Sequence, residues 1–278
     1  MGASERRRAA VLGSPIAHSL SPVLHRAAYR ELGLDWTYDA VEVAGPGLRG
    51  FLDSCDESWV GLSLTMPLKE VVLALLDEVS ELVRLTKSAN TVLLEGTRRR
   101  GENTDVEGIR WALATAGVGS DGGLGSSSVC VIGAGATARS AVAALARMGA
   151  ESIVVAARRE QAVADLASVA VGCGVALEPV SWGGVSAALG ADVVISTVPA
   201  GGSRYLAQHV GGGAGILMDV VYAPWPTPLA QAWEQRGGLA VGGLEMLVGQ
   251  AAVQVELMTG LAAPVDAMHA AGLKALGR

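Results

Sequence analysis

Short apolar runs alternate with segments of helical spacing along most of the chain. The first half shows this alternation in the successive segments RAAVLG, SPVLHRAAYRELG, WTYDAVEV, a glycine-led segment near Leu48, and WVGLSLT. Short apolar runs between turn residues are typical of strands, whereas apolar positions three and four residues apart are typical of helices. The alternation predicts α/β packing around mostly parallel sheets.

The first helix is the most clearly signalled element of this half. Ser21 is the expected N-cap, Pro22 suits the first helical position, and Gly33 suits the residue that ends the helix. The apolar stripe of this helix is formed by Val23, Leu24, Ala27, Ala28 and Leu32.

A second alternation follows a helix expected near 106–116 and the Gly/Ser-rich segment 117–128, which we interpret as a linker between domains. The runs SVCVIG, SIVVAARR, ADVVISTVP and GILMDVVY are continuously apolar. Such runs predict strands buried on both faces of a doubly wound sheet. Segments 243–260 and 264–276 have helical spacing, and we expect these helices to pack back on the first domain.

The composition narrows the class of protein. With 278 residues the chain can form two modest domains. Its formal net charge of -6 argues against a nucleic-acid-binding surface. We find no uncharged apolar stretch of about 18 residues and no signal peptide, so we expect no transmembrane helix and a cytoplasmic location.

Cysteine and histidine spacing argues against a metal site. Cys55, Cys130 and Cys173 lie far apart without a C-x-x-C pair, so we expect reduced, mostly buried thiols. The four histidines show no metal-ligand spacing. We therefore expect no bound metal.

A glycine motif follows the strand expected over SVCVIG. Gly133 permits a tight turn, Gly135 lets a pyrophosphate approach the backbone, and Ala138 lets the following helix pack on the sheet. A G-x-G-x-x-A pattern between a strand and a helix is typical of dinucleotide binding. The predicted phosphate-binding residues are Gly133, Ala134, Gly135, Ala136 and Thr137.

The next strand predicts which dinucleotide binds. An NAD enzyme usually has an acidic residue at its end, but Arg158 and Arg159 stand here. A guanidinium group can bind the 2'-phosphate of NADP, so we predict NADP. The alternative is a pair of solvated arginines at the start of a helix.

Polar residues interrupt the ends of several predicted elements in the first domain. Ser19 and Ser21 stand at a helix entrance, where hydroxyl and N–H groups can hold a carboxylate. Thr65 and Lys69 follow a strand end, where ligands of α/β proteins usually bind. Asp105 begins a helix, where it is as well explained by capping when taken alone.

Together these strings resemble the shikimate dehydrogenase family. The first resembles N-P-I-x-H-S-x-S-P, the second N-V-T-x-P-x-K, and 101–108 resembles G-x-N-T-D-x-x-G. Segments KSANT, DVVYAPWPTPL and GLEMLVGQ resemble three later motifs in the same order. Ser14 and Ser63 stand where the family usually has asparagines. Lys87 and the residues around Arg158 also differ from the family's usual pattern.

The resemblance implies a two-domain α/β fold and reversible NADPH-dependent reduction of 3-dehydroshikimate to shikimate. The implied domains are 1–108 with 247–278 for substrate binding and a Rossmann domain over 109–246. The implied catalytic pair is Lys69 and Asp105. The implied substrate-binding residues are Ser19, Ser21, Thr65, Asn90, Asp105, Tyr222 and Gln250. The remaining cofactor-binding residues are Arg158, Arg159, Val220, Gly243 and Met246.

Three alternatives remain beside this assignment. A quinate or aminoshikimate dehydrogenase would share the scaffold, although the intact Ser19 and Ser21 favour shikimate. A methylenetetrahydrofolate dehydrogenase would not explain the S-x-S string. A non-catalytic NADP sensor predicts loss of Lys69 or Asp105, and both are present. We expect neither a nucleic-acid nor a membrane partner, and a homodimer is the candidate assembly.

Overall fold

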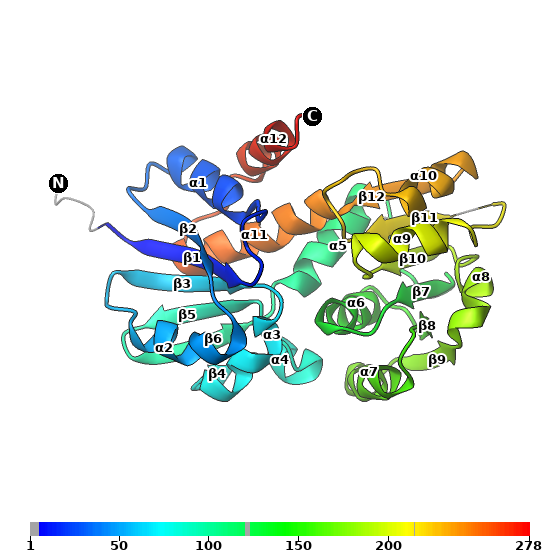
Figure 1. Cartoon of the computed structure of the whole chain (residues 1–278), viewed down its shortest axis with the longest axis horizontal. Helices are drawn as coiled ribbons and strands as arrows, with labels where there is room; N and C mark the ends of the chain where they lie inside the picture. Colours follow the sequence, from blue (N-terminus) through cyan, green and yellow to red (C-terminus); the bar gives the residue numbers. More distant parts are fainter. Residues whose placement is uncertain (1–5, 120–122, 214) are drawn as a thin grey trace. The chain divides into compact units, whose positions relative to one another are not determined.

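The computed structural model describes residues 6–119, 123–213 and 215–278. The chain divides into two compact units, unit 1 with Met1–Thr104 and Leu247–Arg278, and unit 2 with Asp105–Met246. Each unit has a six-stranded sheet with helices around it (Figure 1), which confirms the predicted α/β class.

Unit 1 has a mixed sheet with the strand order β2-β1-β3-β5-β6-β4. Its strands are β1 (Arg8–Gly13), β2 (Thr37–Glu42), β3 (Trp59–Leu64), β4 (Glu78–Val79), β5 (Thr91–Glu95) and β6 (Arg98–Glu102). Strands β2, β1 and β3 are parallel, as predicted, but β5 runs antiparallel to both β3 and β6. The sheet is therefore less parallel than the sequence pattern predicts.

The helices of unit 1 include two that come from the far end of the chain. They are α1 (Ser21–Glu31), η1 (Gly45–Gly47), α2 (Leu48–Asp53), α3 (Leu68–Val71), η2 (Val72–Leu75), α4 (Glu81–Thr86), α11 (Gly243–Thr259), which begins in unit 2, and α12 (Val265–Ala275). Helix α12 packs against α1, as expected for helices that return to the first domain.

The predicted start of α1 is wrong in one detail. Ser21 is its first residue, and Leu20 is the N-cap, without a side-chain cap bond. The hydroxyl oxygen of Ser19 accepts the backbone N–H of Ser21 at 3.3 Å and so supports the helix entrance from one residue further back. Gly33, with φ of +66°, ends the helix as predicted.

Unit 2 has an all-parallel sheet in the order β12-β11-β10-β7-β8-β9. Its strands are β7 (Val129–Ile132), β8 (Ser152–Ala156), β9 (Ala176–Val180), β10 (Val193–Ser196), β11 (Ile216–Asp219) and β12 (Leu239–Gly242). Its other elements are α5 (Asp105–Thr115), α6 (Ala136–Arg147), α7 (Glu160–Cys173), η3 (Trp182–Gly184), α8 (Val185–Ala188), α9 (Ala200–Ala207) and α10 (Pro228–Gln235). This doubly wound order confirms the predicted Rossmann-type unit.

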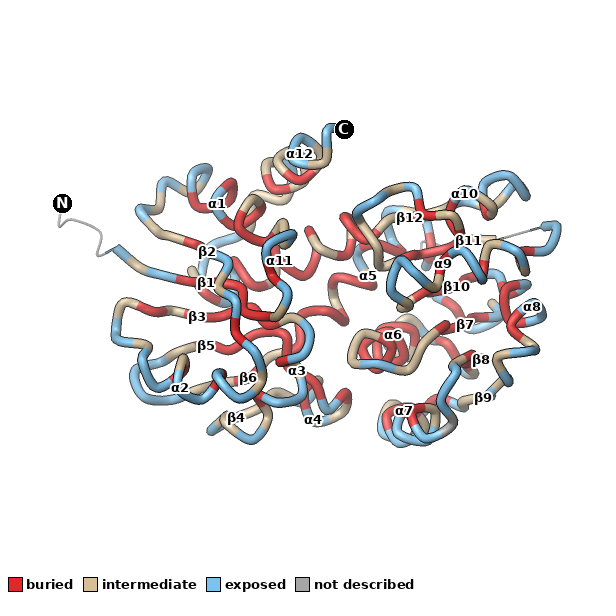
Figure 2. The backbone as a smooth tube through the Cα atoms, viewed as in Figure 1, coloured by how far each residue is buried: buried red, intermediate tan, exposed pale blue. Residues whose placement is uncertain are grey.

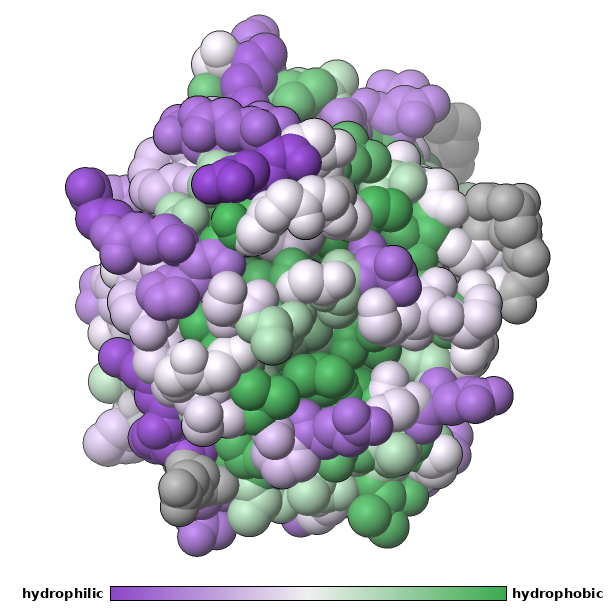
Figure 3. Space-filling model, turned by 90° about the vertical axis from the view of Figure 1, so that its right-hand side faces the viewer, coloured by the Kyte–Doolittle hydropathy of each residue, from purple (hydrophilic) through white to green (hydrophobic). Residues whose placement is uncertain are grey.

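The central strands of this sheet form the core of unit 2. Every residue of β7 and β10 is buried, as their continuously apolar sequences predict (Figure 2). Trp233 of α10 is also fully buried, and its indole N–H donates to the carbonyl oxygen of Gly215 at 2.9 Å. On the face shown in Figure 3, patches of hydrophobic residues lie among hydrophilic ones, which is usual for a protein surface.

The Gly/Ser-rich segment 117–128 does not connect the two units, contrary to the linker prediction. It lies within unit 2, between α5 and β7, and its residues 120–122 are outside the described ranges. The chain instead crosses between units after Thr104 and after Met246. Throughout the described ranges, every helix is too short or too polar to cross a bilayer.

Candidate functional site

The topology of unit 1 gathers several predicted site residues at one edge of its sheet. Thr65 follows the carboxyl end of β3, and Asn90 precedes β5, which runs antiparallel to β3 with Ser63 opposite Thr91. Strand β6 in turn is antiparallel to β5 and ends at the same edge, followed by Thr104. Residues from three separate stretches of chain therefore meet where ligands of α/β proteins bind.

Backbone hydrogen bonds tie these stretches together. The N–H of Thr65 donates to the carbonyl oxygen of Leu12, and the N–H of Ser14 donates to that of Met66, so the loops after β1 and β3 are adjacent. The N–H of Ala89 donates to the carbonyl oxygen of Lys69 at 2.9 Å. Lys69, on the short helix α3, is thus held beside the segment that carries Asn90.

Asn90 is the centre of the polar contacts at this edge. Its side-chain oxygen accepts the backbone N–H of Thr104 at 2.8 Å and the hydroxyl of Thr91 at 2.9 Å. Its side-chain NH₂ group donates to Thr104 Oγ1 at 2.9 Å and to Gln250 Oε1 at 3.3 Å. The predicted residues Asn90 and Gln250, far apart in the chain, are therefore in direct contact.

The predicted carboxylate-binding serines lie at the entrance of α1. Ser21 is buried and Ser19 is half-buried. Below them, Nδ1 of His25 lies 2.9 Å from the carbonyl oxygen of Ser21, and the His25 ring stacks on Tyr38 with ring centroids 3.9 Å apart. Burial lowers the pKa of His25 to about 4, so this ring is neutral near pH 7 and donates from Nδ1.

Asp105 is the first residue of α5 and belongs to unit 2, directly after Thr104 at the end of unit 1. Its side chain is buried, with 3% of its surface exposed. A buried carboxylate at the first turn of a helix is stabilised by the helix dipole. Tyr222 belongs to unit 2 as well, in the loop that follows β11.

In unit 2 the glycine motif occupies the turn between β7 and α6. Gly133 has φ of +110°, and a Cβ atom there would collide with the hydroxyl of Thr197. Its N–H donates to the carbonyl oxygen of Ala156 at 2.9 Å, which fixes the turn against β8. Only glycine suits this position.

The start of α6 has the properties of a phosphate-binding helix end. Gly135 is its N-cap with no side-chain cap bond, and a Cβ atom at Gly135 would meet nothing within 4 Å. The first turn carries no acidic residue, and Ala138 is fully buried against the sheet. Ala134, Ala136 and Thr137 are partly accessible around this helix end. Open space over unpaired N–H groups fits a dinucleotide pyrophosphate.

The two arginines that the sequence assigns to the 2'-phosphate lie at the end of the strand next to β7. Arg158 and Arg159 follow β8, the neighbour of β7 in the sheet, and both are exposed. Arg159 is the N-cap residue of α7. The carboxyl end of this strand is where a Rossmann unit distinguishes the two dinucleotides.

The loop after β11 is held by a buried carboxylate. Asp219 is fully buried and accepts the Thr227 hydroxyl at 2.7 Å and the Val221 N–H at 3.3 Å. Desolvation by burial raises the pKa of Asp219 to about 6, although its hydrogen bonds partly oppose that shift. The two bonds fix both ends of the loop that carries Val220 and Tyr222.

The other two predicted cofactor residues lie where α11 begins. A Cβ atom at Gly243 would collide with the carbonyl oxygen of Val220, so glycine allows α11 to start against this loop. The N–H of Gly243 also donates to the carbonyl oxygen of Val221 at 3.1 Å. Met246 is buried one turn further along α11.

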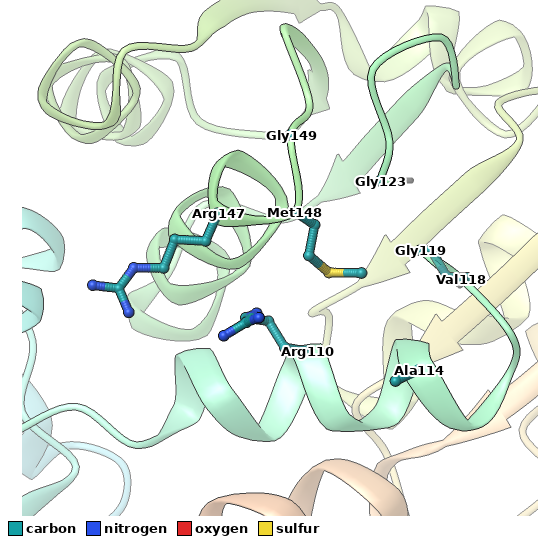
Figure 4. A pocket seen from close by; sticks show the side chains of 8 residues that line it. All are labelled: Arg110, Ala114, Val118, Gly119, Gly123, Arg147, Met148 and Gly149. Carbon is teal, nitrogen blue, oxygen red and sulfur yellow. The ribbon is translucent and has the colours of Figure 1, made fainter. Parts of the chain in front are cut away.

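A cavity of about 480 Å³ in unit 2 lies apart from the glycine motif. Figure 4 shows Arg110 rising from α5 toward the end of α6, where Arg147 and Met148 lie. Both arginines pair with Glu107, at 2.8 Å and 3.4 Å. The cavity is at the carboxyl end of α6, whereas the glycine motif is at its amino end, and no predicted site residue is among those that line it.

The cysteine thiols are less buried than the sequence predicts. All three cysteines are free, but only Cys130 is fully buried, so the expectation of mostly buried thiols is wrong for Cys55 and Cys173. Among the described side chains, no group of three or more His, Cys, Asp or Glu is arranged to hold a metal ion.

The sequence reasoning assigned no role to a buried set of side chains behind Asn90, namely Tyr38, Ser63, Thr91 and Gln254. The spacing of Gln250 and Gln254 offered a signal, because residues four apart lie on the same face of a helix. Ser63 and Thr65 likewise point to one face of a strand.

Comparison with known proteins covers nearly the whole chain. Family models match at 11–92 (shikimate dehydrogenase substrate binding domain), 115–210 (shikimate / quinate 5-dehydrogenase) and 243–271 (shikimate 5'-dehydrogenase C-terminal domain). A shikimate dehydrogenase (NADP(+)) of Methanothrix thermoacetophila is 36% identical over 275 residues, 97% of each chain.

Two solved structures share both fold and sequence with the chain. The shikimate dehydrogenase of Mycobacterium tuberculosis is 40% identical with a TM-score of 0.88, over 96% of this chain and 99% of that one. The shikimate 5-dehydrogenase of Thermus thermophilus, solved in complex with NADP(H) and shikimate, is 32% identical with a TM-score of 0.83, over 97% and 100%. On these matches, the chain belongs to the shikimate dehydrogenase family.

Proposed function

We propose that this protein is a shikimate dehydrogenase that interconverts shikimate and 3-dehydroshikimate with NADP and NADPH. The observation that carries the proposal is the cluster at the edge of the unit 1 sheet, where Thr65, Lys69, Asn90 and Gln250 are brought together. Unit 2 supplies a glycine turn and a helix end that fit a dinucleotide. Relatives that are 32% and 36% identical over 94% and 97% of their own length are named shikimate dehydrogenase (NADP(+)).

The substrate is a ring carboxylate with several hydroxyl groups, and the proposed residues suit each part of it. Ser19 and Ser21, at the entrance of α1, bind the carboxylate with their hydroxyl groups, and Tyr222 assists them. The ring oxygens are bound by Thr65, Asn90, Asp105 and Gln250, which offer amide, hydroxyl and carboxylate partners.

Lys69 and Asp105 are the proposed catalytic pair. Oxidation of the alcohol removes a hydride from carbon and a proton from oxygen, and bound NADP supplies the hydride acceptor. An ammonium group at the oxygen stabilises the negative charge that develops there and can exchange the proton. A carboxylate beside the ammonium group keeps it charged and oriented.

The proposed cofactor is NADP, bound by unit 2. The backbone of Gly133, Ala134 and Gly135 and the first turn of α6, with Ala136 and Thr137, hold the pyrophosphate. Arg158 and Arg159 bind the 2'-phosphate with charge-assisted hydrogen bonds. Val220, Gly243 and Met246 border the nicotinamide.

The test is a rate assay that crosses shikimate and quinate with NADP and NAD. We expect the highest kcat/KM with shikimate and NADP, because both serines and both arginines are present. Quinate oxidation with NAD alone would overturn the substrate and cofactor assignments together and favour the quinate dehydrogenase alternative.

Replacement of the catalytic ammonium group gives a second test. Lys69→Ala should lower turnover by at least about a hundredfold, the usual contribution of a positioned acid or base, while the melting temperature and the Kd for NADP stay close to those of the parent. Lys274→Ala, on the exposed side of α12, is the matched control and should leave turnover unchanged. Nearly normal turnover of Lys69→Ala would reject the catalytic pair.

We further propose that the enzyme works in the cytoplasm as a homodimer. Its three cysteines are free, which suits a reducing compartment. Sedimentation velocity of the purified protein measures the assembly directly, and a monomer at micromolar concentration would reject the dimer.

A further inference from the structure

A chain of hydrogen bonds lies buried in unit 1 behind the proposed substrate residues. Its members are Tyr38, Ser63, Gln254 and Thr91, none of them more than 4% exposed. It joins strands β2, β3 and β5 to helix α11. None of these side chains has a role in the proposed function, yet the chain ends on Asn90, which does.

The chemistry of the donors gives this chain a direction. The Tyr38 hydroxyl donates to Ser63 Oγ at 2.5 Å, and the Ser63 hydroxyl donates to Gln254 Oε1 at 2.7 Å. Since the amide oxygen of Gln254 is engaged by Ser63, its NH₂ group faces Thr91 and donates to Oγ1 at 2.8 Å. Thr91 then directs its own hydroxyl hydrogen to Asn90 Oδ1 at 2.9 Å.

The last bond of the chain fixes the orientation of the Asn90 amide. With the Thr91 hydroxyl and the Thr104 N–H both donating to Oδ1, a flip of the amide would place its NH₂ group against two donors. The NH₂ group therefore stays on the side of Thr104 Oγ1 and Gln250 Oε1. An unmade hydrogen bond is costly in a buried site, so this orientation is strongly preferred.

We infer that Gln254, itself oriented by Ser63 and Tyr38, is a positioning residue that sets the orientation of the Asn90 amide and, through the bond from that amide, of the Gln250 side chain at the proposed substrate site. The inference rests on the proposed function, in which Asn90 binds a ring oxygen of shikimate. Gln254 reaches the substrate site through Thr91 and Asn90, and its side-chain nitrogen also lies 3.4 Å from the carbonyl oxygen of Asn90.

Loss of the Ser63 hydroxyl is the sharpest perturbation of this chain. Without it Gln254 can turn its amide, so that Oε1 faces Thr91 and accepts the Thr91 hydroxyl hydrogen. Asn90 Oδ1 then loses the Thr91 hydroxyl and keeps only Thr104 as its partner, so its amide is held less firmly in one orientation. Substrate binding should weaken more than the chemical step, because Lys69 is untouched.

Ser63→Ala tests this and Ser63→Thr is the conservative rescue. We expect Ser63→Ala to raise the KM for shikimate about five- to tenfold, with kcat changed less than twofold and the KM for NADP unchanged; one lost hydrogen bond is of this size. Ser63→Thr, which keeps the hydroxyl, should restore most of the loss. A KM for shikimate within twofold of the parent in Ser63→Ala would overturn the inference.

Two tyrosines of the same aromatic cluster provide a matched comparison. Tyr38→Phe removes the hydroxyl that starts the chain, whereas Tyr29→Phe removes a buried hydroxyl that has no hydrogen-bond partner among the described residues. Tyr38→Phe should raise the KM for shikimate in the same direction as Ser63→Ala but less, and Tyr29→Phe should not. Equal effects of the two would reject the directed chain.

A double-mutant cycle tests the route through Asn90. In an Asn90→Ala background, Ser63→Ala should have no further effect on the KM for shikimate; an undiminished effect would overturn the proposed route. The side-chain amide signals of Asn90, assigned with Asn90→Ala, give an activity-independent readout by NMR. They should broaden in Ser63→Ala and not in Ser63→Thr, and unchanged signals would reject the positioning role even if the parent enzyme failed to oxidise shikimate.

Discussion

At the scale of single residues, the two glycines of the phosphate-binding turn are required for different reasons. Gly133 is required by the fold, because its positive φ and the nearby Thr197 exclude a side chain. Gly135 has an ordinary backbone conformation with open space around it, so the fold accepts a larger residue there. Its absence of a side chain suits the pyrophosphate of the proposed NADP site.

This difference predicts separable effects of alanine. Gly133→Ala should lower the free energy of unfolding by about 1–3 kcal/mol, the cost of a strained backbone position, and also weaken NADP binding. Gly135→Ala should keep the melting temperature but raise the Kd for NADP about tenfold or more, because its methyl group enters the path of the pyrophosphate. Thermal melting and fluorescence titration with NADPH measure both quantities. Equal destabilisation by the two substitutions would contradict this distinction.

At the scale of elements, the start of α10 links a helix cap to a buried charge. Thr227 is the N-cap, accepts the Ala230 N–H at 3.1 Å, and donates its hydroxyl to Asp219. Thr227→Val should lower the free energy of unfolding by about 2–4 kcal/mol, since both the cap and the donor to a buried carboxyl are lost. The same change should raise the pKa of Asp219 further.

The matched control is the N-cap of α4 in unit 1. Ser80 accepts the Val83 N–H at 3.4 Å and has no buried carboxylate to support. Ser80→Ala should therefore cost only about 0.5–1 kcal/mol. Urea unfolding of the two variants compares these costs, and a Thr227→Val loss no larger than that of Ser80→Ala would show that Asp219 does not depend on the threonine.

Elements were predictable from the sequence where their own residues carry the signal. Buried parallel strands such as β7 and β10 appear as unbroken apolar runs. Strand β6 was missed because it begins with three arginines, of which Arg99 and Arg100 are partly covered by ion pairs with Asp53 of α2 at 2.7 Å and Glu95 of β5 at 3.5 Å. Ion pairs across neighbouring elements leave no periodic pattern.

The residues of the candidate site were also predictable only where the signal is local in the sequence. The glycine turn was predictable because all its requirements lie within a few consecutive residues. The contact between Ser63 and Gln254 joins residues 191 positions apart and depends on how α11 lies on the sheet. No local pattern contains that placement, so the buried chain behind Asn90 emerges only from the structure.

At the scale of the whole molecule, the two units should respond oppositely to acid. In unit 1, His25 has a pKa lowered to about 4, so between pH 6.5 and 4 only its unfolded form binds a proton. The free energy of unfolding therefore decreases as the pH falls through this range. In unit 2, Asp219 has a pKa raised to about 6, so between pH 6 and 3.8 only its folded form binds a proton, and stability rises as pH falls.

Variants of the two residues make this measurable by urea unfolding at pH 7 and pH 4.5. His25→Gln should reduce the acid-induced loss of unfolding free energy by about 2–3 kcal/mol relative to the parent. Asp219→Asn should increase that loss by about 2 kcal/mol. Shifts of the same sign in both variants would contradict the assigned protonation states.

The double crossing of the chain between the units sets an order of events during translation. When the ribosome has made Met246, every strand of unit 2 has been synthesised, whereas α12 and most of α11 have not. Ser63 and Thr91 have then emerged without Gln254, and Asn90 without Gln250. In the nascent chain, all strands of unit 2 are therefore made before the helical segment that supplies the internal polar partners of unit 1.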